Sequence, residues 1–147
     1  MNISLKCPVC KKEIAIPSRP GVEGKDAECA HCHTVQKVAD YLPKLSLKVG
    51  QQNYQLHFGR QWIGRKSDNS DAQVQIPDES RYMSRMHAII EVTCQTDGLQ
   101  VTFEEHGKNP TTLQGIPLEK DDIVYLNQND CLQLGDRKMY LAYEYQD

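Results

Sequence analysis

The segment Ser84–Val92, with the sequence Ser-Arg-Met-His-Ala-Ile-Ile-Glu-Val, decides the fold of this chain. Its first half is a polar turn, and its second half, Ala88–Val92, is a short apolar run typical of a buried strand. Similar short runs recur along the chain, separated by Gly, Asn, Asp and Ser. They are residues 54–58, 73–76, 99–103, 123–126, 131–134 and 139–145. No stretch has a helical period, so this pattern predicts an all-β sandwich or barrel.

Three more short motifs accompany this segment. Ile63-Gly64-Arg65 precedes it, Asn109-Pro110-Thr111 follows it, and the segment 126–135 lies nearer the C-terminus. In this order and at these separations the motifs resemble those of the forkhead-associated (FHA) domain, which carries Gly-Arg, Ser-x-x-His and Asn-Gly-Thr motifs and then a late hairpin. The resemblance covers about residues 45–146. It implies an 11-stranded β-sandwich whose loops at one end bind phosphothreonine peptides.

The resemblance implies binding roles for five residues in these loops. Arg65 is expected to contact the phosphate or the peptide backbone beside it, and Ser84 to donate its hydroxyl to a phosphate oxygen. Arg85 should supply a charged donor, and Asn109 should hydrogen-bond the peptide backbone next to the phosphothreonine. Lys108 stands where the family often has Ser or Thr, so a point charge could replace a hydroxyl there.

Three further residues are expected to support the site rather than touch the ligand. The resemblance gives His87 an architectural role, as a buried histidine that ties the binding loops together. Gly64 would let the chain pack closely before the arginine that follows it, and Thr111 is expected in a turn. Pro110 departs from the Asn-Gly-Thr motif, because proline fixes φ and has no N–H to donate.

The charges of the chain support a phosphate site independently of the resemblance. Phosphothreonine carries about −1.5 to −2 charge and three acceptor oxygens at neutral pH, so its recognition needs several N–H and O–H donors. The chain has a net charge of −3, yet basic residues gather at the motifs. They are Arg65, Lys66, Arg81, Arg85 and Lys108. Each alone is a typical solvated surface charge, but together they indicate an anion-binding cluster.

The N-terminal region carries a different signal, a pair of Cys-x-x-Cys motifs. Cys7 and Cys10 form the first pair and Cys29 and Cys32 the second, with 18 residues between the pairs. This spacing is typical of a zinc site with four thiolate ligands. Four protein ligands leave no position for water, so the sequence predicts one structural zinc per chain and no catalytic metal. The unit resembles a zinc ribbon over residues 5–38.

The alternatives for this region are histidine ligands, a redox motif, disulfides and nucleic-acid binding. His31 or His33 could replace a cysteine as ligand, but four thiolates at matched spacing favour the cysteines. Lys11 and His33 occupy positions where such ribbons often have glycine. A redox motif would need one Cys-x-x-Cys pair within a βαβ pattern, and disulfides would need an oxidising compartment. Residues 1–40 hold six basic and five acidic residues, so their charge does not favour nucleic-acid binding.

The chain therefore divides into a zinc-ribbon-like domain at 1–40, a linker at 41–44 and an FHA-like β-sandwich at 45–147. The N-terminus lacks the apolar segment of a signal peptide and no apolar run is long enough to cross a membrane, so we expect a cytoplasmic protein without membrane contact. The sequence leaves the oligomeric state open.

The function expected is that of a non-catalytic adaptor in Ser/Thr-kinase signalling, which binds a phosphothreonine-containing partner protein. An enzyme is not expected, because no acidic residue is placed to complete a catalytic triad with Ser84 and His87, and there is no P-loop. Two alternatives stay open: a phosphate-independent assembly module and, with less support, a zinc-ribbon regulator that binds nucleic acid.

Overall fold

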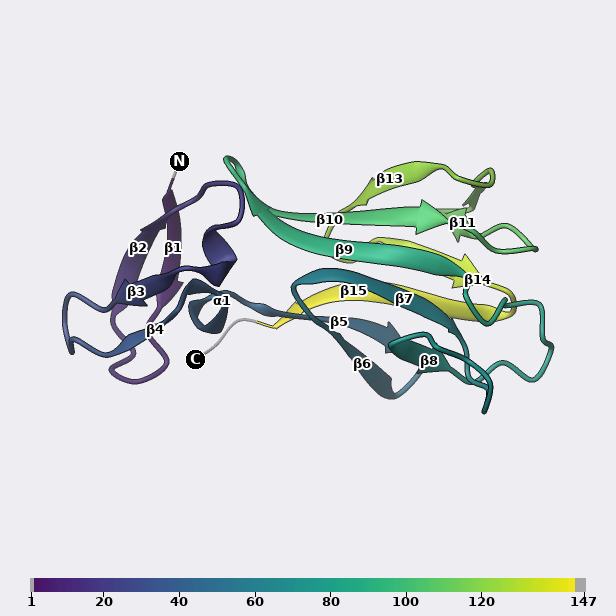
Figure 1. The fold of residues 1–147 in the computed structure, drawn as a ribbon, viewed down its shortest axis with the longest axis horizontal. Coiled ribbons are helices and arrows are strands. Elements are labelled where there is room, and N and C mark those ends of the chain that lie inside the picture. Colours follow the sequence, from purple (N-terminus) through teal and green to yellow (C-terminus); the bar gives the residue numbers. More distant parts are fainter. Residues whose placement is uncertain (1, 145–147) are drawn as a thin grey trace.

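The computed structural model describes residues 2–144, which form a small cysteine-containing unit at one end of a larger β-sandwich (Figure 1). The strands of the small unit are β1 (Asn2–Lys6), β2 (Glu13–Pro17), β3 (Asp26–Glu28) and β4 (Val35–Lys37). They pair as two antiparallel hairpins, β1 with β2 and β3 with β4. Each Cys-x-x-Cys motif lies in the turn of one hairpin, as the ribbon resemblance implies.

The sandwich consists, within the described residues, of two sheets with five and six strands. The first sheet has the order β13 (Ile123–Leu126), β10 (Gly98–Glu105), β9 (Ala88–Gln95), β7 (Gly59–Arg65), β8 (Val74–Ile76). The second has the order β12 (Ile116–Pro117), β11 (Thr112–Leu113), β14 (Cys131–Leu134), β15 (Arg137–Glu144), β5 (Lys44–Val49), β6 (Gln52–Leu56). The all-β prediction and the eleven strands are confirmed.

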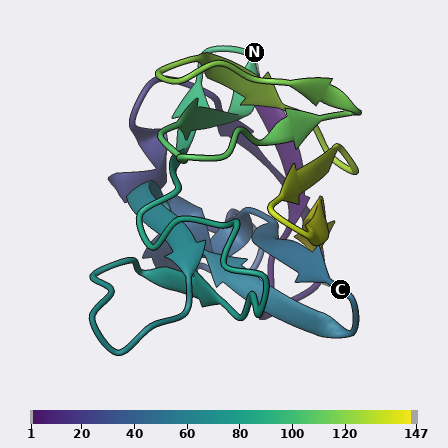
Figure 2. The ribbon, with the colours of Figure 1, turned by 90° about the vertical axis from the view of Figure 1, so that its right-hand side faces the viewer.

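The two sheets bury one continuous hydrophobic core between them. Alternate residues of β9 and β10 face this core, and the register places Phe103 opposite Ile90 and Val101 opposite Val92. All four are buried because successive side chains of a strand point to opposite faces of the sheet. The loops that follow β7, β8 and β10 gather at the end of the sandwich that faces the viewer in Figure 2.

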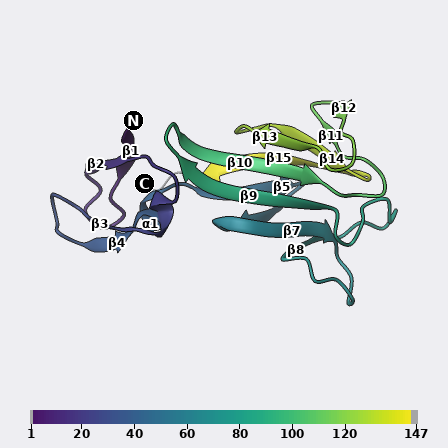
Figure 3. The same cartoon turned by 45° about the horizontal axis from the view of Figure 1, so that its top comes forward.

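The cysteine-containing unit packs against the opposite end of the sandwich, where β9 turns into β10 (Figure 3). The Cys94 N–H donates to the Glu23 carboxylate at 3.1 Å, and the Cys94 carbonyl accepts from the Gly21 N–H at 3.2 Å. The Ser18 hydroxyl also donates to the carbonyl of Gln95. Hydrogen bonds from three points of the N-terminal chain therefore fix this contact.

The join between the units is buried. A one-turn helix, α1 (Val38–Tyr41), ends there, and Tyr41 and Leu42 belong to the apolar core of the N-terminal unit. The linker 41–44 is thus packed rather than exposed, and β5 starts at Lys44. Four residues are too few for a helical period to show in the sequence. The domain limits 1–40 and 45–147 stay predictions. Residue 1 of the first range and residues 145–147 of the second lie outside the described part of the chain.

The strands largely occupy the predicted apolar runs. The segments without a predicted run include the longer strands β1, β5 and β7. They also include β3, β11 and β12, which have two or three residues and are too short for alternation to be visible. No helix between residues 2 and 144 has the length and apolar character needed to cross a bilayer.

Candidate functional site

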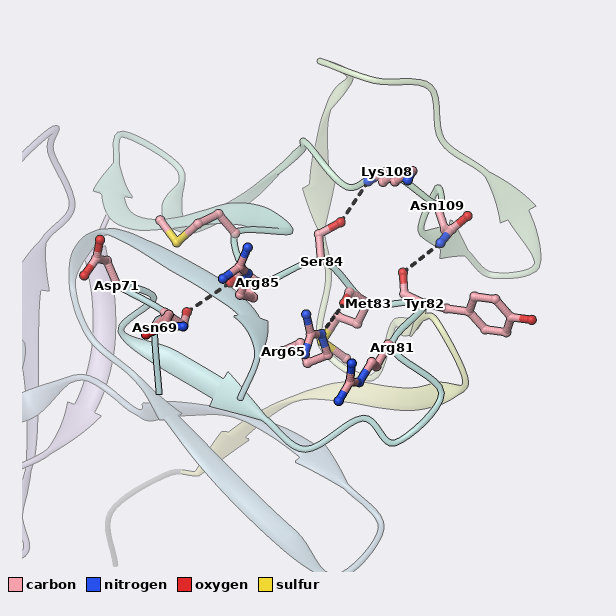
Figure 4. Close-up of a pocket in the computed structure, with 12 residues that line it drawn as sticks. Arg65, Asn69, Asp71, Arg81, Tyr82, Met83, Ser84, Arg85, Lys108 and Asn109 are labelled. Atoms are coloured by element: carbon pink, nitrogen blue, oxygen red, sulfur yellow. Dashed lines mark hydrogen bonds between the residues drawn. The ribbon is translucent and has the colours of Figure 1, made fainter. Parts of the chain in front are cut away.

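A pocket of about 650 Å³ lies at the loop end of the sandwich (Figure 4). All five residues predicted to bind the ligand line it: Arg65, Ser84, Arg85, Lys108 and Asn109. Residues 69–71 and 81–83 complete the walls together with Met86. The structure therefore brings together side chains that lie more than 40 positions apart in the sequence, in loops that follow three different strands.

Arg65 is held at the end of β7 by the loop that carries Ser84. Its N–H donates to the Ser84 carbonyl at 2.9 Å, and its Nε donates to the Met83 carbonyl at 3.2 Å. Gly64 makes this approach possible, because a Cβ there would lie 1.9 Å from the Arg85 carbonyl oxygen. With Nε bonded to the protein, both terminal nitrogens of the guanidinium can face a ligand.

Ser84 connects two loops of the pocket. Its Oγ accepts the Lys108 N–H at 2.9 Å, and its own N–H donates to His87 Nδ1 at 3.0 Å. A hydroxyl that accepts one bond still has its own proton to donate. The expected donation from Ser84 to a phosphate oxygen is therefore compatible with the bonds within the protein.

His87 is fully buried below the pocket and bonds on both sides of its ring. Because Nδ1 accepts the Ser84 N–H, the ring proton must be on Nε2. Nε2 lies 2.9 Å from Thr111 Oγ1, so the ring joins the loop at 84 to the loop at 111. The geometry is that of a residue that ties loops together, with Thr111 buried beside it.

Gly107 has a packing role that the sequence interpretation missed. A Cβ at this position would lie 2.3 Å from Cε1 of His87, so only glycine lets the loop cross the imidazole ring at this distance. The glycine beside Lys108 is a possible sequence signal, but nothing near it in the sequence indicates that it meets a histidine 20 positions earlier.

Glu105 is the second missed residue, and it is a fully buried acid. Its carboxylate accepts the Gly107 N–H at 2.8 Å and the Thr111 N–H at 2.7 Å, and one oxygen lies 3.3 Å from His87 Nε2. Burial lowers the pKa of His87, and the charge of Glu105 opposes that shift. The sequence does contain a signal for this burial. Glu105 continues the alternation of Val101 and Phe103, which places it on the inward face of β10.

Asp78 organises the third wall of the pocket, residues 78–83, and was also missed. The side chain is 8% exposed. It accepts the Ser80 N–H and hydroxyl at 3.2 and 2.6 Å and the Met83 N–H at 2.8 Å. Burial raises the pKa of Asp78, but these hydrogen bonds outweigh it and the net shift is downward. A short acidic residue followed by Ser two positions later is a turn signal.

The remaining predicted residues lie on the rim. Asn109 is exposed and its Nδ2 donates to the Tyr82 carbonyl at 3.0 Å, which joins the loop after β10 to the 78–83 loop. Arg85 is exposed, and its carbonyl accepts the Ser70 hydroxyl at 3.3 Å. Pro110 is exposed and has no N–H to donate.

The pocket is strongly basic. Arg65, Arg81, Arg85 and Lys108 line it, against the single acidic residue Asp71. Within residues 2–144, none of the four cations forms an ion pair with a carboxylate. A concave surface with several unneutralised cations concentrates anions, even on a chain that is acidic as a whole.

The four N-terminal cysteines form a second site at the other end of the molecule. Their sulfur atoms all lie within 4.8 Å of one another, with 3.8 Å between Cys7 and Cys32 and 3.7 Å between Cys10 and Cys29. Tetrahedral coordination with Zn–S bonds of about 2.3 Å requires sulfur separations of about 3.8 Å. The cluster can therefore hold a metal ion of this size.

The two cysteine turns share one backbone geometry. The Lys11 N–H donates to the Cys7 carbonyl at 2.9 Å, and the His33 N–H donates to the Cys29 carbonyl at 2.8 Å. Lys11 and His33 have φ of 65° and 63°, the left-handed conformation for which glycine is usually used. Their positions match those where ribbons often have glycine, so the turn keeps its shape with larger residues.

The other candidate ligands of the N-terminal region lie outside the cluster. His31 Nε2 is 3.3 Å from the Glu13 carbonyl, and His33 Nδ1 is 4.0 Å from the Glu28 carboxylate. Of the two remaining cysteines, Cys94 is buried, and burial raises its pKa to about 12. Cys131 lies in β14 of the sandwich. The group of side chains that could hold a metal ion is therefore the four cysteines that the spacing predicts.

Comparison with known proteins agrees with this geometry. The sequence profile of the FHA domain matches residues 58–135. No curated protein matches the chain. One similar structure comes from a structural and functional analysis of phosphothreonine-dependent FHA domain interactions. It is 26% identical, with a TM-score of 0.53, over 67% of this chain and 95% of that chain.

Two further structures are similar to a comparable degree. The FHA domain of FhaA, solved in complex with the intracellular domain of Rv3910, is 27% identical, with a TM-score of 0.52, over 66% of this chain and 98% of that one. The FHA domain of a Chlamydia trachomatis protein is 26% identical, with a TM-score of 0.54, over 67% of this chain and 96% of that one. Because the FHA-domain profile spans more than half of the sequence, the chain belongs to the FHA-domain family.

Proposed function

We propose that this protein is a non-catalytic adaptor that binds phosphothreonine-containing proteins through the basic pocket, in signalling by Ser/Thr kinases. The observation that carries the proposal is the set of four cations that line the pocket together with Ser84. A phosphate group needs several charged or hydroxyl donors that converge on one point. The structural relative studied for phosphothreonine-dependent interactions supports the same ligand class.

The pocket is shaped before a ligand arrives, which favours recognition. Arg65 is anchored through Nε to Met83 and Ser84 through its N–H to His87, and both partner residues are buried. His87 and Glu105 below them are fully buried and hydrogen-bonded. A site whose donors are already fixed loses less conformational entropy on binding than a flexible one.

We propose that the cysteine cluster holds one structural zinc ion. The four sulfur atoms lie close enough together to surround one ion, and thiolates are typical zinc ligands. Bound zinc would cross-link the two hairpins through Cys7, Cys10, Cys29 and Cys32. A role of this unit in nucleic-acid binding finds no support in its charge balance, and a cytoplasmic location stays a prediction.

The alternative function, a phosphate-independent assembly module, is favoured by one feature of the loop after β10. Lys108 and Pro110 occupy two positions of the family motif where a hydroxyl and a glycine are usual. The Asn109 side chain is already bonded to the Tyr82 carbonyl. A partner could then dock on these loops through surface contacts alone, and phosphate dependence distinguishes the two functions.

The test is a library of phosphothreonine peptides with an unphosphorylated copy of each, measured by fluorescence anisotropy on the full chain. We expect binding only to phosphorylated copies. Arg65→Ala should weaken it about ten- to a hundredfold, because a charge-assisted hydrogen bond to phosphate contributes roughly 1.5–3 kcal/mol. Arg19→Ala, at an exposed arginine of the N-terminal unit, is the matched control. Equal binding of phosphorylated and unphosphorylated copies would favour the assembly role.

A further inference from the structure

The two sheets of the sandwich have outer faces that point away from each other and carry charges of opposite sign. The core lies between the sheets, so the residues that alternate with the core residues of each strand point outward. On β9 and β10 these include Glu91 and Glu104, and on β5 and β15 they include Lys48 and Lys138. We call the outer face of the five-stranded sheet the glutamate face and that of the six-stranded sheet the lysine face.

The strand register gives the two pairs of charges the same spacing. Glu91 and Glu104 lie on neighbouring antiparallel strands, two residues away from being directly opposite. Lys48 and Lys138 have the same diagonal relation on their two strands. Diagonal neighbours of this kind have Cβ atoms about 7 Å apart. The two carboxylates of one copy of the chain can therefore face the two ammonium groups of another copy.

Three of these four charges have no ion pair within the molecule. In the part of the chain that the structure describes, no carboxylate lies within 4.0 Å of either lysine, and no cation lies that close to Glu91. Glu104 is 3.8 Å from Arg60 and 2.5 Å from His106. Glu91 is therefore the carboxylate of the glutamate face that is open to a partner. Complementary charges on two surfaces favour their encounter and fix their register.

Both faces also expose large apolar side chains beside these charges. On β13, at the edge of the glutamate face, Ile123 is 63% exposed and Tyr125 is 69% exposed. On the lysine face Tyr140 is 47% exposed, directly opposite Lys48 and two positions from Lys138. Aromatic side chains are enriched at protein interfaces and supply much of their binding energy. Each face therefore combines apolar contact area with charges of one predominant sign.

The two faces also match in shape and size. Both are outer faces of β-sheets, and two sheets can stack face to face with strands within about 30° of each other. A face of five strands, the longest with eight residues, covers up to about 600 Å². A contact between two such faces would bury up to about 1,200 Å² in total, at the lower limit of specific interfaces. This area fits a weak, reversible contact between copies.

We infer that the glutamate face of one copy of this chain binds the lysine face of a second copy. The two faces lie on opposite sides of one sandwich, so a copy that has formed one contact still has a free face for a third copy. A contact between two different surfaces that does not close into a ring produces an open head-to-tail chain. None of the four charged residues lines the phosphopeptide pocket, so the inference does not depend on the proposed function.

The experiment is sedimentation velocity of the full chain over a series of protein concentrations, at low and at high salt. We expect the weight-average sedimentation coefficient to rise with concentration and to pass the value of a dimer. High salt should weaken the association, because it screens the charges on both faces. A monomer at every concentration up to the solubility limit would overturn the inference, and so would association that stops at a dimer.

Charge reversal shows which faces are in contact. Glu91→Lys should weaken the association about tenfold or more, and Lys48→Glu should do the same, because like charges would then face each other. An equimolar mixture of the two variants should associate again, since each supplies the intact face that the other lacks. Glu79→Lys and Lys66→Glu make the same charge changes at exposed positions outside both faces and should associate like the wild type.

Tyr125→Thr tests the apolar part of the contact. It removes the ring, keeps a residue that favours strands, and should weaken the association about fivefold or more. Thermal melts show whether each variant is folded. Where a charge reversal unfolds the chain, Glu91→Gln and Lys48→Gln take its place and should each weaken the association about threefold.

The remaining outcomes are decisive as well. Association that is unchanged in both charge reversals, or that does not recover in their mixture, overturns the inference. Phosphothreonine peptides should bind these variants as they bind the wild type. A failure of the head-to-tail contact therefore leaves the phosphothreonine function intact, and a chain that associates without binding any phosphopeptide refutes only that function.

Discussion

The two units of this molecule hold their loops in place by different means. In the sandwich, a continuous core between two sheets carries the framework, and the loops rest on buried hydrogen bonds of His87, Glu105 and Asp78. The N-terminal unit buries only a few apolar side chains around its sulfur atoms and shares its core with Cys94 of the sandwich. A unit of this size has too small a core to be stable without a cross-link.

Each unit is therefore destabilised by a different loss. Loss of metal should act on the N-terminal unit, whereas loss of a buried polar partner should act on the pocket. The two effects should stay separate except at the contact between Glu23 and Cys94, which is one of the hydrogen bonds between the units.

Removal of the metal should produce the largest change. Chelation is expected to unfold the N-terminal unit, residues 2–37, because binding free energy of a structural metal is folding free energy. The sandwich, residues 44–144, should keep its amide NMR spectrum and serves as the internal control. Native mass spectrometry should show one zinc per chain before chelation. An ordered N-terminal unit in the metal-free chain would break the comparison.

Disruption of the buried network should come next. His87→Ala leaves the Ser84 N–H and groups around Thr111 without a partner and should lower the free energy of unfolding by roughly 2–3 kcal/mol. Ser84→Ala, at the half-buried pocket surface, should cost less than about 1 kcal/mol. Thermal melts of the two variants test whether His87 supports the loops and Ser84 faces the ligand. Equal losses of stability, or a larger loss for Ser84→Ala, would show that the two roles are assigned wrongly.

The pH dependence of stability tests the same histidine. Burial holds the pKa of His87 below its ordinary value of 6.5, so the unfolded state binds a proton that the folded state does not. Stability from this residue is therefore present above pH about 6.5 and declines as the pH falls below it. Denaturant titrations from pH 7.5 to 5.5 should show this decline in the wild type and a shallower one in His87→Ala.

A smaller effect is expected at the contact between the units. Glu23→Ala removes the acceptor of the Cys94 N–H, and this amide should exchange its hydrogen about fivefold faster, the equivalent of roughly 1 kcal/mol. Hydrogen exchange followed by NMR measures it, with Glu79→Ala, an exposed residue of the sandwich, as control. Unchanged exchange at Cys94 would mean that Glu23 does not hold the units together.

The smallest effect concerns Lys108. Lys108→Ala keeps the backbone N–H that bonds Ser84 and removes only an exposed charge, so phosphopeptide affinity should fall about two- to fivefold. Its salt dependence should also become weaker. Lys66→Ala removes a neighbouring lysine that does not line the pocket and is the control. No change in either variant would show that the lysine does not replace the missing hydroxyl.

Much of this arrangement could be predicted from the sequence, because its signals are local. Alternation and turn residues indicate strands, and the Cys-x-x-Cys spacing indicates the cluster of Cys7, Cys10, Cys29 and Cys32. The motif order places Arg65 and Ser84 at one pocket. Each of these conclusions depends on residues near one another or on a motif order typical of a known family.

The residues that hold the pocket loops in place could not be predicted in the same way. Glu105 looks like a surface acid in the sequence, and its burial follows only from its register on β10 and from donors supplied by residues 107 and 111. Gly107 is needed because it lies against the ring of His87, which precedes β9. Asp78 is needed because its carboxylate accepts the N–H of Met83. The alternation along β10 indicates that Glu105 faces inward, but the contacts of all three residues are long-range or loop-closing and leave no periodic signal in a single sequence.

The most direct test of the central claim is an NMR titration of the full chain with a phosphothreonine peptide and its unphosphorylated copy. We expect amide shifts at Arg65, Ser84, Arg85 and Asn109 with the phosphorylated peptide alone, and none in the N-terminal unit at the other end of the molecule. A folded chain that shows no shift at these four residues with any peptide of an unbiased phosphothreonine library would contradict it. The phosphate-independent assembly role would then be the better account.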